Sequence, residues 1–282
     1  MVLNADFHVD LINHVREAGN EGYGQNHCDC KPKGGVGKTT TAVNLAASLG
    51  SLEKKTLLVD IDPQGNSSSG VGVDRRKLKN TVYEILLDEA KPSEVLIHTG
   101  FQNLDLIPSS MDLAAAELEL VNLKNRESIL RRAILPLRAE YDYIIMDCPP
   151  SLGIITTNAL CLADTLLVPV QCEYYALEGL SQLMNSVRRV KRQYNEQLDI
   201  EGVLLTMYDG RLNLTQQVVD EVKRYFPRKV FATVVPRTVR LSEAPSFGKP
   251  VLYFDRASKG SAAYEALAME IIQNNQGEGR TE

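Results

Sequence analysis

The sequence lacks an excess of positive charge: it has 31 Lys and Arg against 36 Asp and Glu, with a formal net charge of -5 and a pI near 5.5. A surface coated in basic charge is therefore excluded, and any nucleic-acid contact needs a local basic patch. No apolar run approaches the roughly 20 residues that span a bilayer, and no basic-then-apolar signal opens the chain. Five cysteines without framework spacing indicate a reducing compartment. We therefore expect a cytoplasmic protein without membrane attachment.

Short β-branched runs alternate with amphipathic stretches from Lys33 onward. This alternation predicts an α/β fold, with a mostly parallel twisted sheet flanked by helices on both faces, in one domain over residues 33–274. A polar tail, residues 275–282, follows it and is expected to fray. The predicted strands are Thr56–Asp60, Leu104–Ile107, Tyr143–Asp147, Thr165–Val170, Gly202–Met207 and Val230–Val235. The predicted helices are Thr39–Leu49, Thr81–Asp88, Met111–Leu120, Ser128–Glu140, Ile155–Leu162, Leu177–Tyr194, Leu214–Tyr225 and Ser261–Asn274.

Residues 1–32 depart from this pattern. A glycine-rich phosphate loop should leave a buried apolar strand, but the run before Lys33 is Gln-Asn-His-Cys-Asp-Cys-Lys-Pro. One interpretation is an atypical but genuine N-terminal segment. The other is a frameshift. Synonymous codons can be chosen for residues 23–34 so that reading the same DNA from one base later gives Met-Gly-Lys-Ile-Ile-Ala-Ile-Ala-Asn-Gln. One A added to the A-run that follows then returns the reading to the present frame at Lys33. Residues 1–22 would then be translated from upstream DNA.

A glycine-rich run leads directly into a strong helix-forming segment. Glycines allow the backbone to wrap phosphate oxygens, and the helix N-terminus presents unpaired N–H groups to the anion. Lys38 reaches the β- and γ-phosphates, and Thr39 ligates Mg²⁺. We therefore predict a P-loop NTPase. The nucleotide-binding residues in this run are Lys33, Gly34, Gly35, Val36, Gly37, Lys38, Thr39 and Thr40.

Acidic residues stand at the ends of two predicted strands. Asp60 and Asp62 follow the run Leu-Leu-Val, and Asp147 ends the run Tyr-Ile-Ile-Met. The second arrangement is that of a Walker B motif, which puts Asp147 near Mg²⁺ through water. Asp60 is expected to support the metal shell. An acid often caps a strand with no further role, but the P-loop favours the functional interpretation.

The lysine that opens the P-loop makes the pattern more specific. Lys-Gly-Gly-x-Gly-Lys-Thr, from Lys33 to Thr39, resembles the deviant Walker A motif of the ParA/MinD class. The runs at 171–179, 206–211 and 236–246 closely resemble Soj-type ParA proteins, so the resemblance spans residues 33 to about 270. It implies that Lys33 reaches across a nucleotide-sandwich dimer to the partner's phosphates, as an arginine finger does.

The resemblance also implies the remaining roles. Asp62 positions the attacking water and belongs to the metal site with Thr39 and Asp147, so the expected catalytic residues are Lys33, Lys38 and Asp62. Pro236 and Arg237 border the adenine of ATP. Arg211 and Arg240 contribute to a nonspecific DNA-binding surface on the dimer, although sequence alone favours surface salt bridges for both. A ParB-type centromere-binding protein would stimulate hydrolysis and release a nucleoid-associated dimer from DNA.

Two other functions remain open on the same fold. MinD-like division-site regulators carry a basic amphipathic C-terminal helix, whereas Ile271–Gly279 is neither basic nor strongly amphipathic. A small-molecule ligase that forms amide bonds would show substrate-dependent release of ADP. A nitrogenase-type reductase needs cluster-ligating cysteines, whereas Cys148, Cys161 and Cys172 are predicted to be buried small hydrophobic residues.

Overall fold

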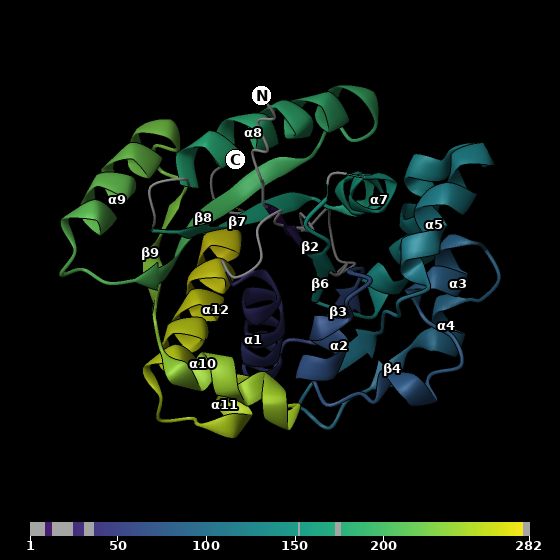
Figure 1. Cartoon of the computed structure of the whole chain (residues 1–282), viewed down its shortest axis with the longest axis horizontal. Helices are drawn as coiled ribbons and strands as arrows, with labels where there is room; N and C mark the ends of the chain where they lie inside the picture. Colours follow the sequence, from purple (N-terminus) through teal and green to yellow (C-terminus); the bar gives the residue numbers. More distant parts are fainter. Residues whose placement is uncertain (1–8, 13–24, 31–36, 152, 173–175, 279–282) are drawn as a thin grey trace, which may run out of the picture.

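The computed structural model describes residues 9–12, 25–30, 37–151, 153–172 and 176–278 of the chain, and it contains one mixed sheet flanked by helices (Figure 1). The strands follow the order β4-β5-β3-β6-β1-β2-β7-β8-β9, and every described pairing is parallel except those of β1 and β4. The strands are β1 (Val9–Ile12), β2 (Gln25–Cys30), β3 (Thr56–Asp60), β4 (Ile97–His98), β5 (Leu104–Ile107), β6 (Tyr143–Cys148), β7 (Thr165–Gln171), β8 (Asp199–Tyr208) and β9 (Val230–Pro236).

The helices connect successive strands, as parallel pairing requires. They are α1 (Lys38–Ser51), α2 (Asn66–Gly70), α3 (Val82–Leu86), α4 (Pro92–Val95), α5 (Leu113–Glu119), α6 (Ile129–Ile134), α7 (Ile154–Leu162), α8 (Ala176–Gln193), α9 (Asn213–Tyr225), α10 (Val239–Glu243), α11 (Val251–Phe254) and α12 (Lys259–Glu278). Short 3₁₀ helices are η1 (Arg75–Lys77), η2 (Leu120–Asn122), η3 (Arg126–Ser128), η4 (Leu135–Ala139) and η5 (Ala244–Phe247).

Alternating strand residues build a separate core on each face of the sheet. Leu58 and Ile145 pack with α1 and α12 on one face, whereas Leu57, Val59 and Ile144 pack with the helices between α3 and α9 on the other. All five of these side chains are at most 2% exposed. The helix-flanked, mostly parallel sheet predicted from the sequence is confirmed, and burial on both faces explains why strands such as β3 and β6 are almost continuously apolar.

The predicted elements recur with shifted ends. The strands β3 and β5 have the predicted bounds, while the predicted helix Ser128–Glu140 divides into α6 and η4. The last helix, α12, continues to Glu278, four residues beyond the predicted helix end at Asn274. The short helices α2, α4, α10 and α11 were not predicted, because segments of four or five residues contain too little periodicity.

The strand β2 lies where the apolar strand before a P-loop belongs. It pairs in parallel with β6 on one side and with β7 on the other, and β1 pairs antiparallel with β2, β6 and β7. The sequence pattern had not predicted a strand over Gln25–Cys30. A backbone can make ladder hydrogen bonds whatever its side chains are, and this explains how a polar run joins the sheet.

The strand β9 forms one edge of the sheet, where its backbone is open to pairing. The carboxylate of Glu270 on α12 accepts hydrogen bonds from the backbone amides of Ala232 (2.7 Å) and Thr233 (2.9 Å). A side chain from the adjacent helix therefore satisfies two donors of an edge strand.

Two further findings bear on the sequence predictions. Cys161 and Cys172 are free and buried in the core, as predicted for small hydrophobic residues. Cys148 is also buried but is disulfide-bonded, which the sequence did not predict. Within the described part of the chain, every helix is too short or too polar to cross a bilayer.

Candidate functional site

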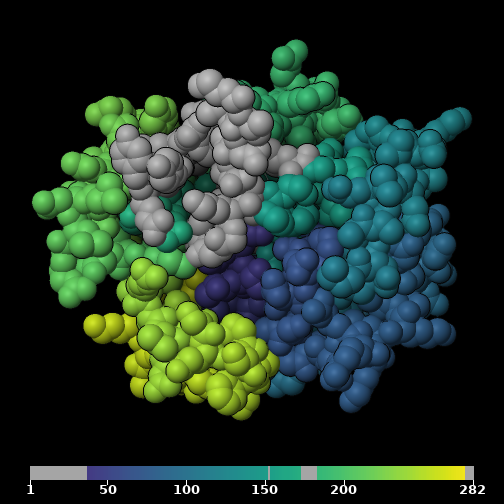
Figure 2. All heavy atoms as spheres, viewed as in Figure 1, coloured from purple at the N-terminus to yellow at the C-terminus, as the bar shows by residue number. Residues whose placement is uncertain are grey.

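The start of α1 forms one wall of the predicted nucleotide site. Gly37, its N-cap, has φ 92°, a left-handed conformation that favours glycine. The Lys38 ammonium donates a hydrogen bond to the carbonyl oxygen of Cys148 (2.8 Å), which ties the P-loop helix to the end of β6. Residues Lys33–Val36 lie outside the described residues. In the space-filling view, purple atoms near the start of α1 are visible between the blue segment after β3 and the yellow-green segment after β9 (Figure 2).

Two of the predicted acids meet at the carboxyl ends of β3 and β6. Asp60 and Asp147 are direct neighbours in the parallel register, and both are fully buried. Asp62 is 5% exposed, and its backbone amide donates to the Asp60 carboxylate (3.2 Å). The Asp62 carboxylate in turn accepts from the backbone amide of Gln64 (2.9 Å). The structure therefore places the three predicted acids beside the P-loop helix.

The helix α2 holds two of these acids through consecutive serines. The Ser67 hydroxyl donates to the carboxylate of Asp147 (2.6 Å). The Ser68 hydroxyl (2.7 Å) and backbone amide (2.8 Å) both donate to the carboxylate of Asp60. The Ser68 hydroxyl also accepts from the backbone amide of Ser109 (3.1 Å). These serines were missed in the sequence because a short run of Asn, Ser and Gly after a strand is typical of a loop.

Burial changes the charge balance of the paired acids. It raises the pKa of Asp60, and the neighbouring Asp147 raises that pKa further. Burial also raises the pKa of Asp147, but the Lys38 ammonium opposes this effect. The Ser67 hydroxyl, which donates to Asp147, and the nearby Thr39 hydroxyl also lower the pKa of Asp147. Buried negative charge is costly here until a cation compensates it.

The side-chain oxygens of Asp147 and Thr39 suit Mg²⁺ binding. The Oδ1 atom of Asp147 is buried and has no hydrogen-bond partner within normal limits among the described residues, and the Thr39 hydroxyl lies close to the same carboxyl. Magnesium prefers oxygen ligands and keeps several waters, with one or two carboxylates and substrate phosphates completing its shell. In the described ranges, no three His, Cys, Asp or Glu side chains form a metal cage of their own. The residues present therefore fit a metal held jointly with phosphate.

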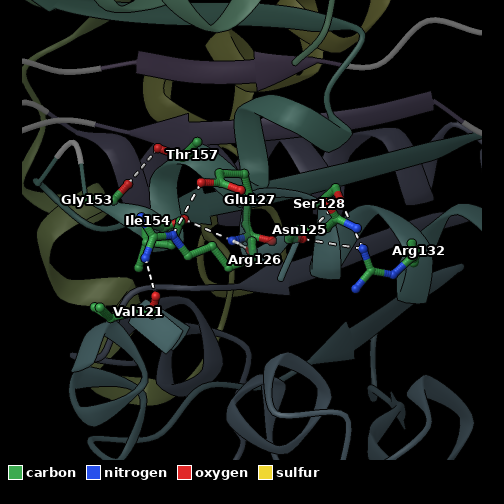
Figure 3. A network of polar contacts seen from close by, with 10 residues as sticks. Val121, Asn125, Arg126, Glu127, Ser128, Arg132, Gly153, Ile154 and Thr157 are labelled. Carbon is green, nitrogen blue, oxygen red and sulfur yellow. Dashed lines mark hydrogen bonds and ion pairs between the residues drawn. The ribbon is translucent and has the colours of Figure 1, made fainter. Parts of the chain in front are cut away.

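The chain that follows β6 is anchored by a network of polar contacts (Figure 3). The Asn158 amide on α7 donates to the carbonyl oxygens of Arg126 (2.7 Å) and Ile154 (3.0 Å), and its own oxygen accepts from the backbone amide of Leu130 (3.1 Å). The Arg126 guanidinium donates to the Val121 carbonyl. These bonds fasten α7 to η3 and α6, so the segment between Asp147 and α7 connects two fixed points.

The other predicted site residues lie farther along the chain. Pro236 ends β9, and Arg237 is exposed just beyond it. Both residues therefore lie at the carboxyl ends of the parallel strands, as the acids do. Arg211 follows β8, and its guanidinium binds the Asp209 carboxylate through two bonds (2.8 and 2.6 Å). Arg240 pairs with Glu243 and Asp255. Both DNA-site candidates are thus exposed arginines in surface ion pairs.

A P-loop helix packed against two strands that end in acids defines a P-loop ATPase. A family model described as an AAA domain matches residues 30–200. The chain is 55% identical over 248 residues to the chromosome partitioning protein ParA of Myxococcus xanthus, covering 88% of both chains. It is also 55% identical over 242 residues to the sporulation initiation inhibitor protein Soj of Bacillus subtilis, covering 86% of this chain and 96% of that protein.

Among solved structures, the cobyrinic acid a,c-diamide synthase of Mycobacterium smegmatis with bound ADP and magnesium superposes with a TM-score of 0.77. It is 35% identical, and the match covers 88% of this chain and 93% of that one. The much higher identity to the two partitioning proteins decides the assignment: the chain belongs to the ParA/Soj family of partitioning ATPases.

Proposed function

We propose that this ParA/Soj-family ATPase segregates DNA through a cycle of ATP-dependent dimerisation, nonspecific DNA binding and hydrolysis-driven release. The observation that carries this proposal is that Asp60, Asp62 and Asp147 lie beside Lys38 at the carboxyl ends of β3 and β6. Buried acids beside a P-loop lysine suit a site in which a metal ion and a triphosphate balance each other's charge. The family membership supports the same assignment.

The residues of the site divide into those that hold ATP and Mg²⁺ and those that act in hydrolysis. Thr39 and Asp147 would hold Mg²⁺, which when bound neutralises charge on the phosphate oxygens. Lys38 would move from the Cys148 carbonyl to the phosphates. Lys33 would stabilise the partner's phosphates across the dimer, and Pro236 and Arg237 would border the adenine. Asp62 would orient the attacking water.

Two variants separate assembly from hydrolysis. Lys38→Ala removes the cation that offsets the triphosphate charge, so it should abolish ATP-dependent dimerisation. Asp62→Ala should spare ATP binding and trap an ATP-bound dimer that no longer releases phosphate. Dimer mass in the presence of ATP and phosphate release are measured on the same samples. An ATP-dependent dimer of the Lys38 variant, or normal phosphate release by the Asp62 variant, would contradict the assigned roles.

The DNA part of the proposal rests on exposed arginines whose present ion pairs are weak. The Arg211 side chain is 89% exposed and that of Arg240 is 53% exposed. Exposed ion pairs contribute little stability, so both guanidiniums can exchange a carboxylate for a DNA phosphate at small cost. The ATP-bound dimer would bring two copies of each arginine to one duplex, and a ParB-type partner would release it by stimulating hydrolysis.

Arg211→Glu and Arg240→Glu should each weaken DNA binding by a similar factor on unrelated sequences. Each lost phosphate contact should reduce the log-log salt slope by roughly one. Binding is measured by fluorescence anisotropy across a salt series. Arg76→Glu is the control, because Arg76 is as exposed as Arg211 and is likewise paired with a nearby carboxylate, that of Asp74. A loss confined to one DNA sequence would show that these arginines are not phosphate contacts. ATP affinity should not change.

A ligase that forms amide bonds is the second candidate, because a diamide synthase shares the fold and 35% identity. It predicts that ADP release needs a carboxylic acid substrate and an amine donor. Under the partitioning proposal, ADP release requires neither and rises with DNA and a ParB-type protein. One ATPase assay with these additions distinguishes the two functions.

A further inference from the structure

Ser67 connects two parts of the site that are distant in sequence. It lies in α2, directly after the turn from Asp62 to Gly65, which is closed by a hydrogen bond from the Gly65 amide to the Asp62 carbonyl (2.8 Å). Its hydroxyl donates to Oδ2 of Asp147, 80 residues away, at 2.6 Å. Ser67 and Asp147 are both fully buried. Water therefore cannot replace this donor without rearrangement of the site.

The two oxygens of Asp147 have different surroundings. Oδ2 accepts the Ser67 hydroxyl, whereas Oδ1 is buried without a hydrogen-bond partner within the described ranges. A hydrogen bond to one oxygen of a carboxylate fixes the orientation of the side chain, so the other oxygen points in a defined direction. Groups that orient metal-ligating carboxylates in this way strongly influence metal affinity.

We propose that Ser67 is a positioning residue for Mg²⁺: it holds Asp147 by Oδ2 so that Oδ1 faces the metal and its waters. This inference rests on the proposed ATP and Mg²⁺ site. Since the Asp62 turn leads directly into α2, Ser67 also links the carboxylate assigned to the attacking water with the carboxylate assigned to the metal. Movement of the turn would change the orientation of Asp147.

The neighbouring serine has a different role. Ser68 donates twice to Asp60 and accepts from the Ser109 amide, so it joins β3 to the segment after β5 and is part of the framework. Ser67 makes one described side-chain bond, and that bond ends on the acid beside Lys38 and Thr39. Removal of the Ser67 hydroxyl should therefore affect the metal more than the fold.

The test compares Ser67→Ala with Ser109→Ala in the full chain. Ser109 is also fully buried, and its hydroxyl has no hydrogen-bond partner among the described residues, so it is a matched control. Calorimetry measures the affinity for a non-hydrolysable ATP analogue across a MgCl₂ series and in EDTA. For Ser67→Ala, half-saturating Mg²⁺ should rise about tenfold while affinity in EDTA equals that of the wild type. Ser109→Ala should match the wild type in both conditions.

Other outcomes overturn the inference in distinguishable ways. A Ser67→Ala titration that superimposes on the wild type, or an equal loss of affinity with and without Mg²⁺, would make Ser67 structural. If the wild type shows no dependence on Mg²⁺, the proposed metal site itself is wrong. Ser67→Cys covers the case in which the alanine variant does not fold. It keeps a similar size and a weaker donor, so its half-saturating Mg²⁺ should be higher than that of the wild type while its affinity in EDTA is unchanged. A wild-type value would overturn the inference.

Discussion

The strands β2 and β6 lie side by side at the centre of the sheet, but their sequences have opposite character. They pair in parallel from Gln25 opposite Tyr143 to Cys30 opposite Cys148. Every residue of β6 is buried, and its one charged residue stands next to the end, where the site needs it. The polar residues of β2 are spread along its whole length. Backbone pairing can therefore hold a strand in its place in the sheet without the apolar pattern that normally stabilises it.

The frameshift hypothesis explains this contrast. In the alternative frame, residues 25–30 become Lys-Ile-Ile-Ala-Ile-Ala, which has the apolar character of β6 and precedes the same P-loop. The family match begins at residue 30, so most of β2 lies outside it. We propose that the polar run derives from a shifted reading frame. Three experiments measure how far the centre of the sheet depends on apolar residues and on its buried acids.

The largest change in the free energy of unfolding is expected from a polar substitution in β6. Ile144 is fully buried and is the register partner of Asn26 in β2. Ile144→Asn should lower the free energy of unfolding by about 4 kcal/mol or more, because it removes core packing and buries an amide. Val121→Asn, at a side chain 54% exposed, should change it by less than about 0.5 kcal/mol. Urea denaturation measures both. A cost below about 1 kcal/mol at Ile144 would show that this part of the sheet tolerates polar residues.

A smaller change, an increase in the free energy of unfolding, is expected when the alternative frame is restored over residues 23–32. Three isoleucines and two alanines would then occupy a central strand, and the free energy of unfolding should rise by at least about 2 kcal/mol. Affinity for ATP should rise too, because the P-loop would leave a better packed strand. Denaturation and calorimetry on both chains measure these changes, under reducing conditions because the restored frame also replaces Cys28 and Cys30. Unchanged ATP affinity would count against the hypothesis, and resequencing the A-run shows whether a base was misread.

The smallest effect, for a change of one pH unit, is expected from the buried acids at the ends of β3 and β6. Burial raises the pKa of Asp60 from 3.8 to about 8. A carboxyl with a raised pKa in the folded state stabilises the protein at low pH, and this contribution is lost as pH rises toward the folded value. The unfolding free energy of the metal-free protein should therefore fall as pH rises from 4 to 8, by about 1 kcal/mol or less for each pH unit.

Asp60→Asn is the control for this pH dependence, because an amide does not titrate. Its unfolding free energy should depend less on pH over the same range, as measured by urea denaturation at each pH. A wild-type protein that becomes more stable as pH rises would contradict the direction of the shift. If the expected fall is observed, the acids of β3 and β6 differ from the polar residues of β2, because Mg²⁺ and ATP can relieve the cost of burying them.

Local patterns predicted the fold and the acids at the ends of β3 and β6, but the contacts between the candidate site residues depend on distant parts of the chain. The apolar runs before Asp60 and Asp147 marked two strands and the acids at their ends, because strand composition and strand position are both local. The bond from Lys38 to the Cys148 carbonyl joins residues 110 positions apart, and the bond from Ser67 to Asp147 spans 80. The sequence shows no periodicity that could indicate such contacts.

The two surface arginines show a different limit. Sequence alone favoured ion pairs for Arg211 and Arg240, and the structure contains these pairs. The DNA role came only from the family resemblance and stays a prediction. An exposed ion pair is compatible with both roles, since its geometry without DNA does not show which anion the guanidinium prefers.

The Glu270 cap on β9 has a consequence for how copies of this protein can meet. An uncapped edge strand offers its amides to any other extended chain, and such contacts extend without limit. By occupying the Ala232 and Thr233 amides, one carboxylate makes growth of the sheet at this side unfavourable. Under the proposed cycle of dimerisation and release, the protein would benefit from having its least reversible mode of association blocked.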